Sequence, residues 1–172
     1  LIHCLRTGSY FQKGRSNVVA AVAAGSVSEL TRQVCEGEAT NGFAVTRPPG
    51  HHAERTHAMG FCLVNNVAVA AQLAREKWGC KRVLIYDWYD TVADSRPESS
   101  PLLCTVAELT LWRGAVAVAQ DVHHGNGVQN AFLSDPSVLY ISTHRGGLEQ
   151  SFFYPGTGTM KEVACHSCTS FW

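Results

Sequence analysis

The sequence predicts an α/β protein with a three-layer α/β/α arrangement around a mostly parallel sheet. Two apolar runs, 82–87 and 138–142, indicate strands in a sheet covered on both faces, because their apolar residues run on instead of alternating with polar ones. Apolar residues three and four positions apart indicate helices before and between these strands. Polar side chains follow both runs, and ligands bind beyond the carboxyl ends of strands in such sheets.

The first helix is predicted to begin at Ser16-Asn17 and to stop at Gly37. Its apolar residues recur at helical spacing, at Val19, Val22, Ala23, Val27, Leu30 and Val34. A short strand at 43–46 then leads into the Arg-Pro-Pro-Gly sequence of 47–50. Consecutive prolines exclude helix, so the residues after them start from a stiff loop.

A second helix is predicted to begin at Asn65 or Asn66, either of which can cap it, and to end at Gly79. One face of this helix is apolar and is formed by Val67, Ala70, Ala71 and Ala74. The sequence therefore predicts a helix packed on the sheet ahead of the first long strand.

The two long strands end on polar residues. The strand at 82–87 ends on the carboxylate of Asp87, and the strand at 138–142 ends on Ser142, followed by Thr143. These side chains are expected at the edge of the sheet where function usually lies. The plainer alternative for Asp87 is a loop cap.

Composition excludes several classes of protein. The 172 residues carry no net charge, which indicates one globular domain without the basic block that direct nucleic-acid binding needs. The longest weakly charged run, 102–120, contains Glu108 and Arg113 and predicts no membrane span. Seven irregularly spaced cysteines favour reduced thiols in the nucleus or cytoplasm. A start at Leu1, without Met or a secretory signal, suggests a fragment.

Two motifs carry the chemistry. Residues 47–52 read Arg-Pro-Pro-Gly-His-His, and residues 121–127 read Asp-Val-His-His-Gly-Asn-Gly. A histidine pair on a rigid turn and a short Asp-x-His are components of a metal-assisted hydrolytic site. Taken alone, a histidine pair is more often a surface or capping feature, and Asp121 with His123 supplies only two ligands where zinc sites use three or four.

Together these motifs make the chain resemble a class II zinc-dependent histone deacetylase, in the fold that deacetylases share with arginases. The matching segments are 41–45, 47–54, 59–62, 65–68, 82–88, 121–127, 135–142 and 154–158. The resemblance implies hydrolysis of acetyl-lysine amides on histones or other proteins, with zinc polarising the acetyl carbonyl and activating water.

The resemblance also implies roles for individual residues. Asp121 and His123 match two of the three zinc ligands. Among the catalytic residues, His51 matches the histidine that a buried carboxylate orients, and His52 the general base and acid. The partners implied for these two histidines are Asp87 and Asn126.

Two further sets of residues follow from the same resemblance. Gly60, Phe61 and Tyr154 would line the acetyl-lysine tunnel, although the two aromatic residues would serve equally well in the core. A potassium ion would be held by Asp87, Ser142 and Thr143, together with Asp121 and His123.

The chain also departs from the family. Residues 89–120 separate Asp87-Trp88 from Asp121, and removing them restores the continuous family motif, so they are interpreted as an insertion. In that motif the two aspartates are two residues apart and point the same way, about 6–7 Å between Cα atoms. The insertion must therefore loop out, with its apolar residues 115–119 hidden, for the site to form.

The carboxyl-terminal end departs as well. Residues 164–172 do not follow the family, and the third zinc ligand and the oxyanion-stabilising residue are expected downstream of Trp172. The sequence is therefore interpreted as a partial histone deacetylase domain over 1–172, interrupted at 89–120.

Two hypotheses follow. The chain is a zinc deacetylase acting on acetyl-lysine or an acetylpolyamine, or it is a catalytically inactive deacetylase-like fragment or protein-binding module. An arginase-like or deaminase-like hydrolase is disfavoured by the histidine motifs. By resemblance, the expected setting is chromatin regulation and transcription repression in the nucleus or cytoplasm. The expected partners are acetylated histones, other acetyl-lysine proteins and corepressor proteins.

Overall fold

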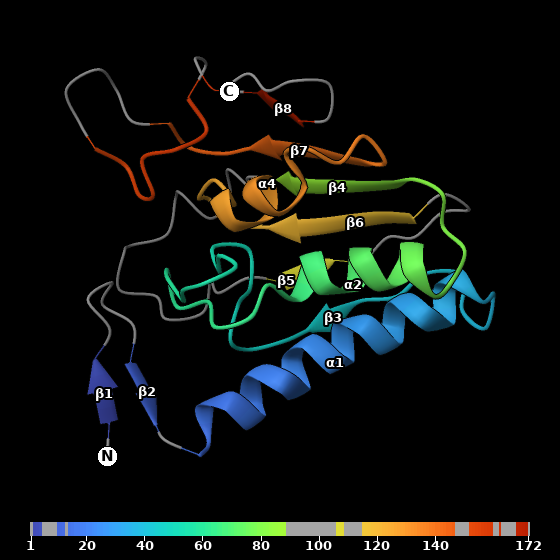
Figure 1. The fold of residues 1–172 in the computed structure, drawn as a ribbon, viewed down its shortest axis with the longest axis horizontal. Coiled ribbons are helices and arrows are strands. Elements are labelled where there is room, and N and C mark those ends of the chain that lie inside the picture. Colours follow the sequence, from blue (N-terminus) through green and yellow to red (C-terminus); the bar gives the residue numbers. More distant parts are fainter. Residues whose placement is uncertain are drawn as a thin grey trace.

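The computed structural model describes residues 2–4, 10–12, 14–88, 106–108, 115–146, 152–159, 162 and 168–171 (Figure 1). The helices are α1 (Ser16–Cys35), α2 (Asn66–Glu76) and α4 (Asn126–Phe132). The strands are β1 (Ile2–Cys4), β2 (Tyr10–Gln12), β3 (Ala44–Val45), β4 (Val83–Trp88), β5 (Val106–Glu108), β6 (Ala115–Gln120), β7 (Val138–Thr143) and β8 (Cys168–Phe171). No helix in these ranges has the length and apolar character needed to cross a membrane.

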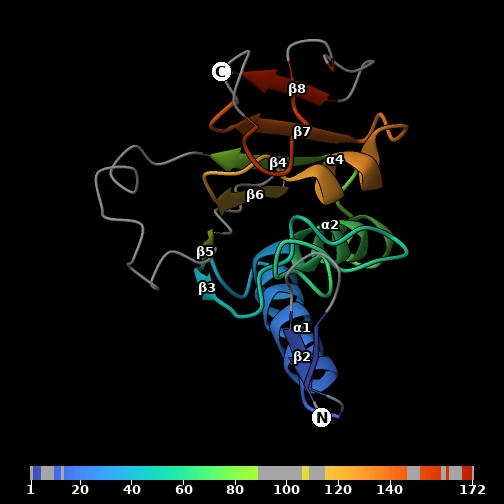
Figure 2. The same ribbon diagram turned by 90° about the vertical axis from the view of Figure 1, so that its left-hand side faces the viewer.

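The described strands form a six-stranded sheet in the order β3-β5-β6-β4-β7-β8, and β1 and β2 form a separate antiparallel pair. Strands β6, β4, β7 and β8 run parallel to one another, whereas β5 is antiparallel to both β3 and β6. Figure 2 shows β8 at one edge of this sheet and β3 at the other. The predicted α/β class with a mostly parallel sheet is confirmed.

Helix α1 buries part of the predicted apolar face, including Ala23 and Val27, and Leu30 and Val34 are partly buried against the core. Its buried residues are small: Ala20, Ala23, Ala24, Val27 and Thr31. Val19 and Val22 remain 49% and 62% exposed, so the prediction is wrong for these two positions. Helix α1 lies alongside α2 (Figure 1). The predicted stop at Gly37 is confirmed, because its φ of +79° suits a helix end.

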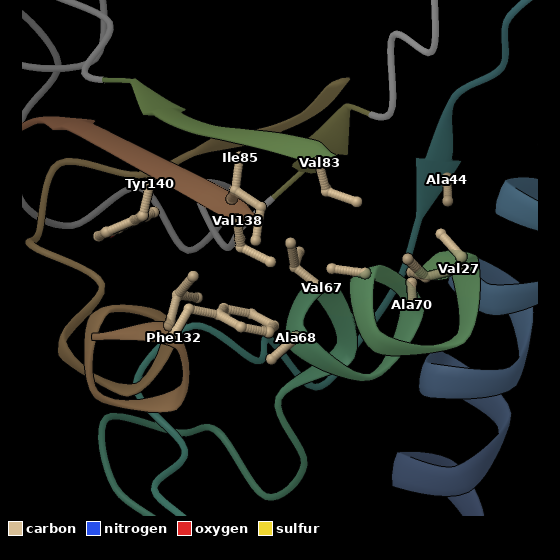
Figure 3. Packing of buried hydrophobic residues seen from close by; sticks show 13 residues of the cluster. Val27, Ala44, Val67, Ala68, Ala70, Val83, Ile85, Phe132, Val138 and Tyr140 are labelled. Atoms are coloured by element: carbon tan, nitrogen blue, oxygen red, sulfur yellow. The ribbon is translucent and has the colours of Figure 1, made fainter. Parts of the chain in front are cut away.

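Helix α2 follows its prediction. The Asn65 side chain caps it by accepting from the backbone nitrogen of Ala68 at 3.1 Å. The predicted apolar residues Val67, Ala70, Ala71 and Ala74 are all buried. They meet Val83 and Ile85 of β4 and Val138 of β7, and Phe132 of α4 packs beside them (Figure 3). Helices α2 and α4 therefore share one face of the sheet and its core.

Strand β4 alternates between buried and half-buried residues instead of being buried throughout as predicted. Val83, Ile85 and Asp87 are buried, whereas Leu84, Tyr86 and Trp88 are half-buried. The covered face is therefore the one that carries Asp87 together with the core residues. The Asp87 carboxylate therefore lies on the covered face of the sheet, near the carboxyl end of a central strand.

Residues 115–120, inside the predicted insertion, form strand β6 between β4 and β5. Because β6 is parallel to β4 and pairs Gln120 with Trp88, the next residue, Asp121, lies level with the position after Trp88. The Asp121 backbone nitrogen donates to the Trp88 carbonyl oxygen at 3.2 Å, which continues this register. In a continuous motif Asp121 would directly follow Trp88. Here it lies at the same height along the sheet, but at the end of the neighbouring strand β6. The boundaries 89–120 of the insertion stay a prediction.

Candidate functional site

The histidine pair lies on a turn held between α2 and α4. His51 and His52 are 1% and 3% exposed. A Cβ at Gly50 would lie 2.5 Å from the backbone nitrogen of Asn66, so only glycine allows this close approach. From the other side, the backbone nitrogen of Val128 donates to the His51 carbonyl oxygen at 3.2 Å. Backbone packing therefore fixes both imidazoles.

His51 and Asp87 form a buried pair. Nδ1 of His51 lies 2.8 Å from Oδ2 of Asp87, and the Tyr140 hydroxyl donates to the same oxygen at 3.0 Å. Burial lowers the pKa of His51, but the carboxylates of Asp121 and Asp87 outweigh it and raise this pKa to about 9. His51 is therefore protonated at neutral pH, with Nδ1–H donating to Asp87.

Asp121 reaches the same cluster from the end of β6. Its Oδ2 lies 3.4 Å from Nε2 of His51, and its Oδ1 lies 2.8 Å from Nδ1 of His123. Burial raises the pKa of Asp121, but the charge on His51 and the bonds from His123 outweigh it and hold this pKa well below its usual range. The two carboxylates, Asp87 and Asp121, thus meet around one imidazolium despite the residues that separate them in sequence.

His52 is paired with Asn126, as the resemblance implies, at 2.8 Å between Nδ1 and Oδ1. The amide nitrogen of Asn126 donates to Oε1 of Glu54 at 2.6 Å, and that of Asn130 donates to the same oxygen at 2.9 Å. A carboxylate only accepts, so Glu54 turns the Asn126 oxygen toward His52. Nδ1 of His52 then carries the proton, and Nε2 keeps its lone pair.

The charge state of His52 agrees with this arrangement. Burial, and next the neighbouring imidazolium of His51, lower the pKa of His52 to about 3. His52 is therefore neutral at physiological pH. A neutral imidazole with a free Nε2 lone pair can accept a proton from a nearby group.

Replacing Glu54 with Gln should loosen this control of the tautomer. A glutamine can donate as well as accept, so Asn126 can turn over and His52 can carry its proton on Nε2 instead. We expect the ring ¹⁵N shifts of His52 to report Nδ1–H alone in the unmodified chain and a mixture in Glu54→Gln. The exposed Glu76→Gln is the matched control. An unchanged His52 spectrum in Glu54→Gln would contradict the assignment.

Two of the residues predicted for the substrate tunnel stand beside His52. The rings of Tyr154 and His52 meet edge to face with centroids 5.0 Å apart, and a Cβ at Gly60 would lie 2.9 Å from the Tyr154 hydroxyl. Phe61 is 66% exposed, which excludes the alternative of a core aromatic residue for it. Its φ of +63° is a strained value for a residue other than glycine.

An aromatic contact that the sequence did not indicate lies on the other side of the cluster. Phe153 stacks on His123 with centroids 5.1 Å apart and an angle of 13° between the rings. The guanidinium of Arg145 lies 4.9 Å from the centre of the Phe153 ring.

The sequence also did not indicate a hydrogen-bond network around His124. Its Nδ1 lies 2.8 Å from the Thr157 hydroxyl, and its Nε2 lies 2.9 Å from the side-chain oxygen of Gln129.

The residues predicted for potassium lie on adjacent strands. Asp87 of β4 pairs in register with Ser142 of β7, and Thr143 ends β7. Ser142 is fully buried, with its hydroxyl 2.9 Å from Nδ1 of His144. The potassium site stays a prediction.

The atoms best placed to hold a metal ion come from His51, His52 and Asp121, whose ligand atoms all lie within 4.8 Å of one another. The resemblance assigns zinc to Asp121 and His123. The two sets share Asp121, and His123 contacts it directly. All the predicted histidine and aspartate residues of the site are therefore brought together.

Comparisons with known proteins agree with this geometry. The histone deacetylase domain family matches residues 5–90 and 108–171. Histone deacetylase 4 of Caenorhabditis elegans is 41% identical over 157 residues, which is 90% of this chain and 14% of that protein. Histone deacetylase 7 of Homo sapiens is 38% identical over 165 residues, which is 96% of this chain and 14% of that protein.

Among solved structures, the crystal structure of the HDA15 HD domain matches with a TM-score of 0.73 and 39% identity. The match covers 98% of this chain and 40% of that chain. The chain thus spans only a small part of these curated relatives and less than half of the solved domain. The predicted arginase/deacetylase fold and the resemblance to class II deacetylases are confirmed, and the chain belongs to the histone deacetylase family.

Proposed function

We propose that this chain carries the zinc-binding and proton-transfer residues of a deacetylase that hydrolyses acetyl-lysine amides on histones or other proteins. One observation carries the proposal: His51, His52 and Asp121 converge to within 4.8 Å although residues 89–120 interrupt the motif. The pairing of His51 with Asp87 and of His52 with Asn126 supports the same function.

Zinc fits the chemistry of this cluster. Imidazole nitrogens and carboxylate oxygens are its usual ligands. The carboxylates of Asp87 and Asp121 face a single imidazolium, so a cation would balance the remaining buried negative charge. When bound, zinc would polarise the acetyl carbonyl and acidify the attacking water.

The residues of the cluster would have different roles in the reaction. By the family resemblance, Asp121 and His123 would hold zinc, while Asp87 and Asn126 orient His51 and His52 through their Nδ1 atoms. Neutral His52 would take a proton at Nε2 and return it to the departing amine. His51, which Asp87 holds through Nδ1, would stand beside the reacting carbonyl.

The substrate would enter beside the aromatic residues. Tyr154 stands edge-on to His52, and Phe61 is exposed nearby along the chain. An acetyl-lysine side chain has a long aliphatic stem, which aromatic walls suit. The proposed partners are acetylated histones or other acetyl-lysine proteins, with corepressor proteins, in the nucleus or cytoplasm.

The second candidate applies if the chain acts without further residues. The chain spans 14% of two curated deacetylases and 40% of a solved domain, and the resemblance assigns one zinc ligand outside it. A site with two protein ligands binds zinc weakly. The alternative is therefore a noncatalytic deacetylase-like module that binds proteins.

A matched pair of proteins separates these candidates: the chain as it stands and a variant that lacks 89–120. The deacetylase candidate predicts about one zinc ion per chain in both, because Asp121 lies level with the position after Trp88 in either case. Asp121→Ala should weaken zinc binding at least about 100-fold in both. Zinc content is measured by mass spectrometry, and hydrolysis with an acetyl-lysine peptide.

The outcomes point in different directions. Zinc and turnover in both proteins support the deacetylase. Zinc without turnover in either supports the noncatalytic module. Zinc in the shortened variant alone would show that residues 89–120 destroy the site.

A further inference from the structure

Two cysteines meet at the opposite end of the parallel strands from the histidine cluster. Cys35 is the last residue of α1, and Cys80 follows α2 in the turn that leads into β4. Their Sγ atoms lie 3.4 Å apart, although the residues are 45 positions apart in sequence. Both side chains are half-buried against the edge of the hydrophobic core. The contact is therefore made by the packing of α1 on α2.

The backbone at both cysteines is anchored. The backbone nitrogen of Cys80 donates to the carbonyl oxygen of Ala74 at 3.0 Å, and that of Glu36, next to Cys35, donates to Arg32 at 2.9 Å. A disulfide has an S–S distance of about 2.05 Å, so the sulfurs must approach by roughly 1.4 Å.

The other described free cysteine does not compete. Cys62 is fully buried beside the histidine turn, where it accepts from the His52 backbone nitrogen at 3.4 Å and donates to the Gly60 carbonyl oxygen at 3.3 Å. Its position is set by these two bonds. Of the three free cysteines described, only Cys35 and Cys80 face each other.

We propose that Cys35 and Cys80 form a redox-modification site, at which a peroxide-class oxidant converts the two thiols into a disulfide. One sulfur attacks the peroxide and becomes a sulfenic acid, while the O–O bond breaks and the first water leaves. The second sulfur then attacks the sulfenic sulfur and expels the second water. Two thiols and one hydrogen peroxide thus give one disulfide and two waters, and the peroxide oxygen is reduced.

The contact between the two sulfurs suits the second step. Burial, and then the contact with Cys80, raise the pKa of Cys35. As the disulfide closes, the leaving hydroxide takes the proton of the second thiol.

The disulfide would enclose the part of the chain that carries the histidine pair. The segment between Cys35 and Cys80 includes His51, His52 and all of α2. Closing a loop of 45 positions restricts the unfolded chain, which should raise the midpoint of thermal unfolding by about 10 °C. The inference does not depend on the proposed deacetylase function.

Tryptic mapping tests the linkage without ambiguity. Trypsin releases Cys35 in the peptide 33–55, because Pro48 blocks cleavage after Arg47, and releases Cys80 in the peptide 78–81. Each peptide contains one cysteine. After treatment of the reduced chain with hydrogen peroxide, we expect these two peptides to be joined, with a loss of two hydrogens. We also expect the thermal midpoint to rise and dithiothreitol to reverse both changes.

Single variants test the sulfenic acid intermediate. In Cys35→Ser and in Cys80→Ser the remaining cysteine has no partner to close the disulfide, so dimedone should trap a sulfenic acid there. Neither variant should show the thermal shift. If the peptides 33–55 and 78–81 stay unlinked while peroxide oxidises other cysteines, the proposal is wrong. A linkage of either cysteine to a third one would also overturn it.

Discussion

Replacing Asp87 with Ala should lower the free energy of unfolding by about 3–5 kcal/mol at pH 6. Two buried donors then lose their acceptor, the protonated Nδ1 of His51 at 2.8 Å and the Tyr140 hydroxyl at 3.0 Å. Asp121 cannot replace the lost acceptor, because its carboxylate faces Nε2 on the opposite side of the His51 ring. Urea unfolding of zinc-free protein measures the change.

The cost should depend on pH in a direction that the pKa of His51 fixes. This pKa is raised from its ordinary 6.5 to about 9, so the stabilisation is fully present below pH 6.5 and is lost as the pH rises through 9. Asp87→Ala should therefore cost less at pH 10 than at pH 6. A cost that stays level between these pH values would contradict the charged pair.

The control is a carboxylate that lies in an ion pair near the surface. Asp135 pairs with Arg75, and the two side chains are 27% and 24% exposed. Asp135→Ala should cost less than about 1 kcal/mol through this ion pair and show no transition near pH 9. The comparison separates a buried site residue from an ordinary surface charge.

The sequence predicted the parts of the fold that depend on local pattern. Strands β4 and β7 are apolar runs of strand length, and α2 has a cap at Asn65 and an apolar face at helical spacing. Helix α1 was placed correctly along the chain, and Ala23 and Val27 of its predicted apolar face are buried, but Val19 and Val22 are not. Periodicity identifies the apolar residues of a helix, whereas the neighbouring helix decides whether Val22 or Ala23 is covered.

The pairing of β6 could not be predicted from pattern alone. Residues 115–119 form an apolar run of strand length, which is a signal for a strand within the predicted insertion. Which strand it joins depends on contacts with β4 that the local sequence does not contain. The consequence matters for the site, because this pairing brings Asp121 level with the end of β4.

The motifs predicted the histidine and aspartate residues of the site but not those that support them. Glu54 follows the histidine pair by two residues, yet its bond to Asn126 joins segments 72 positions apart. Phe153 precedes the predicted Tyr154, yet its stacking on His123 appears only when the loop folds back. Supporting contacts of this kind are set by tertiary packing, so they leave no periodic trace in the sequence.

Gly125→Ala should destabilise the chain by about 2–4 kcal/mol and separate His51 from Asp87. Gly125 caps α4 with an ordinary φ of −80°, so the effect is purely steric. An added Cβ would lie nearest to Oδ2 of Asp87. It would also lie 2.6 Å from the Tyr140 hydroxyl and 3.1 Å from Nδ1 of His51. These atoms are buried and bonded to one another, so none can move aside without breaking the pair.

Two comparisons make this prediction specific. Gly25→Ala lies within α1 with open space around it, and should stabilise the chain by about 0.5–1 kcal/mol because alanine favours helix. Adding Tyr140→Phe to Gly125→Ala removes one of the clashing atoms, and should recover part of the lost stability. Thermal unfolding measures all three variants, and the ring ¹⁵N shifts of His51 report its bond to Asp87. If Gly125→Ala stabilised the chain as Gly25→Ala does, the prediction would be wrong. The start of α4 would then not be packed against His51 and Asp87, and the packing that brings Asn126 to His52 would not hold this pair.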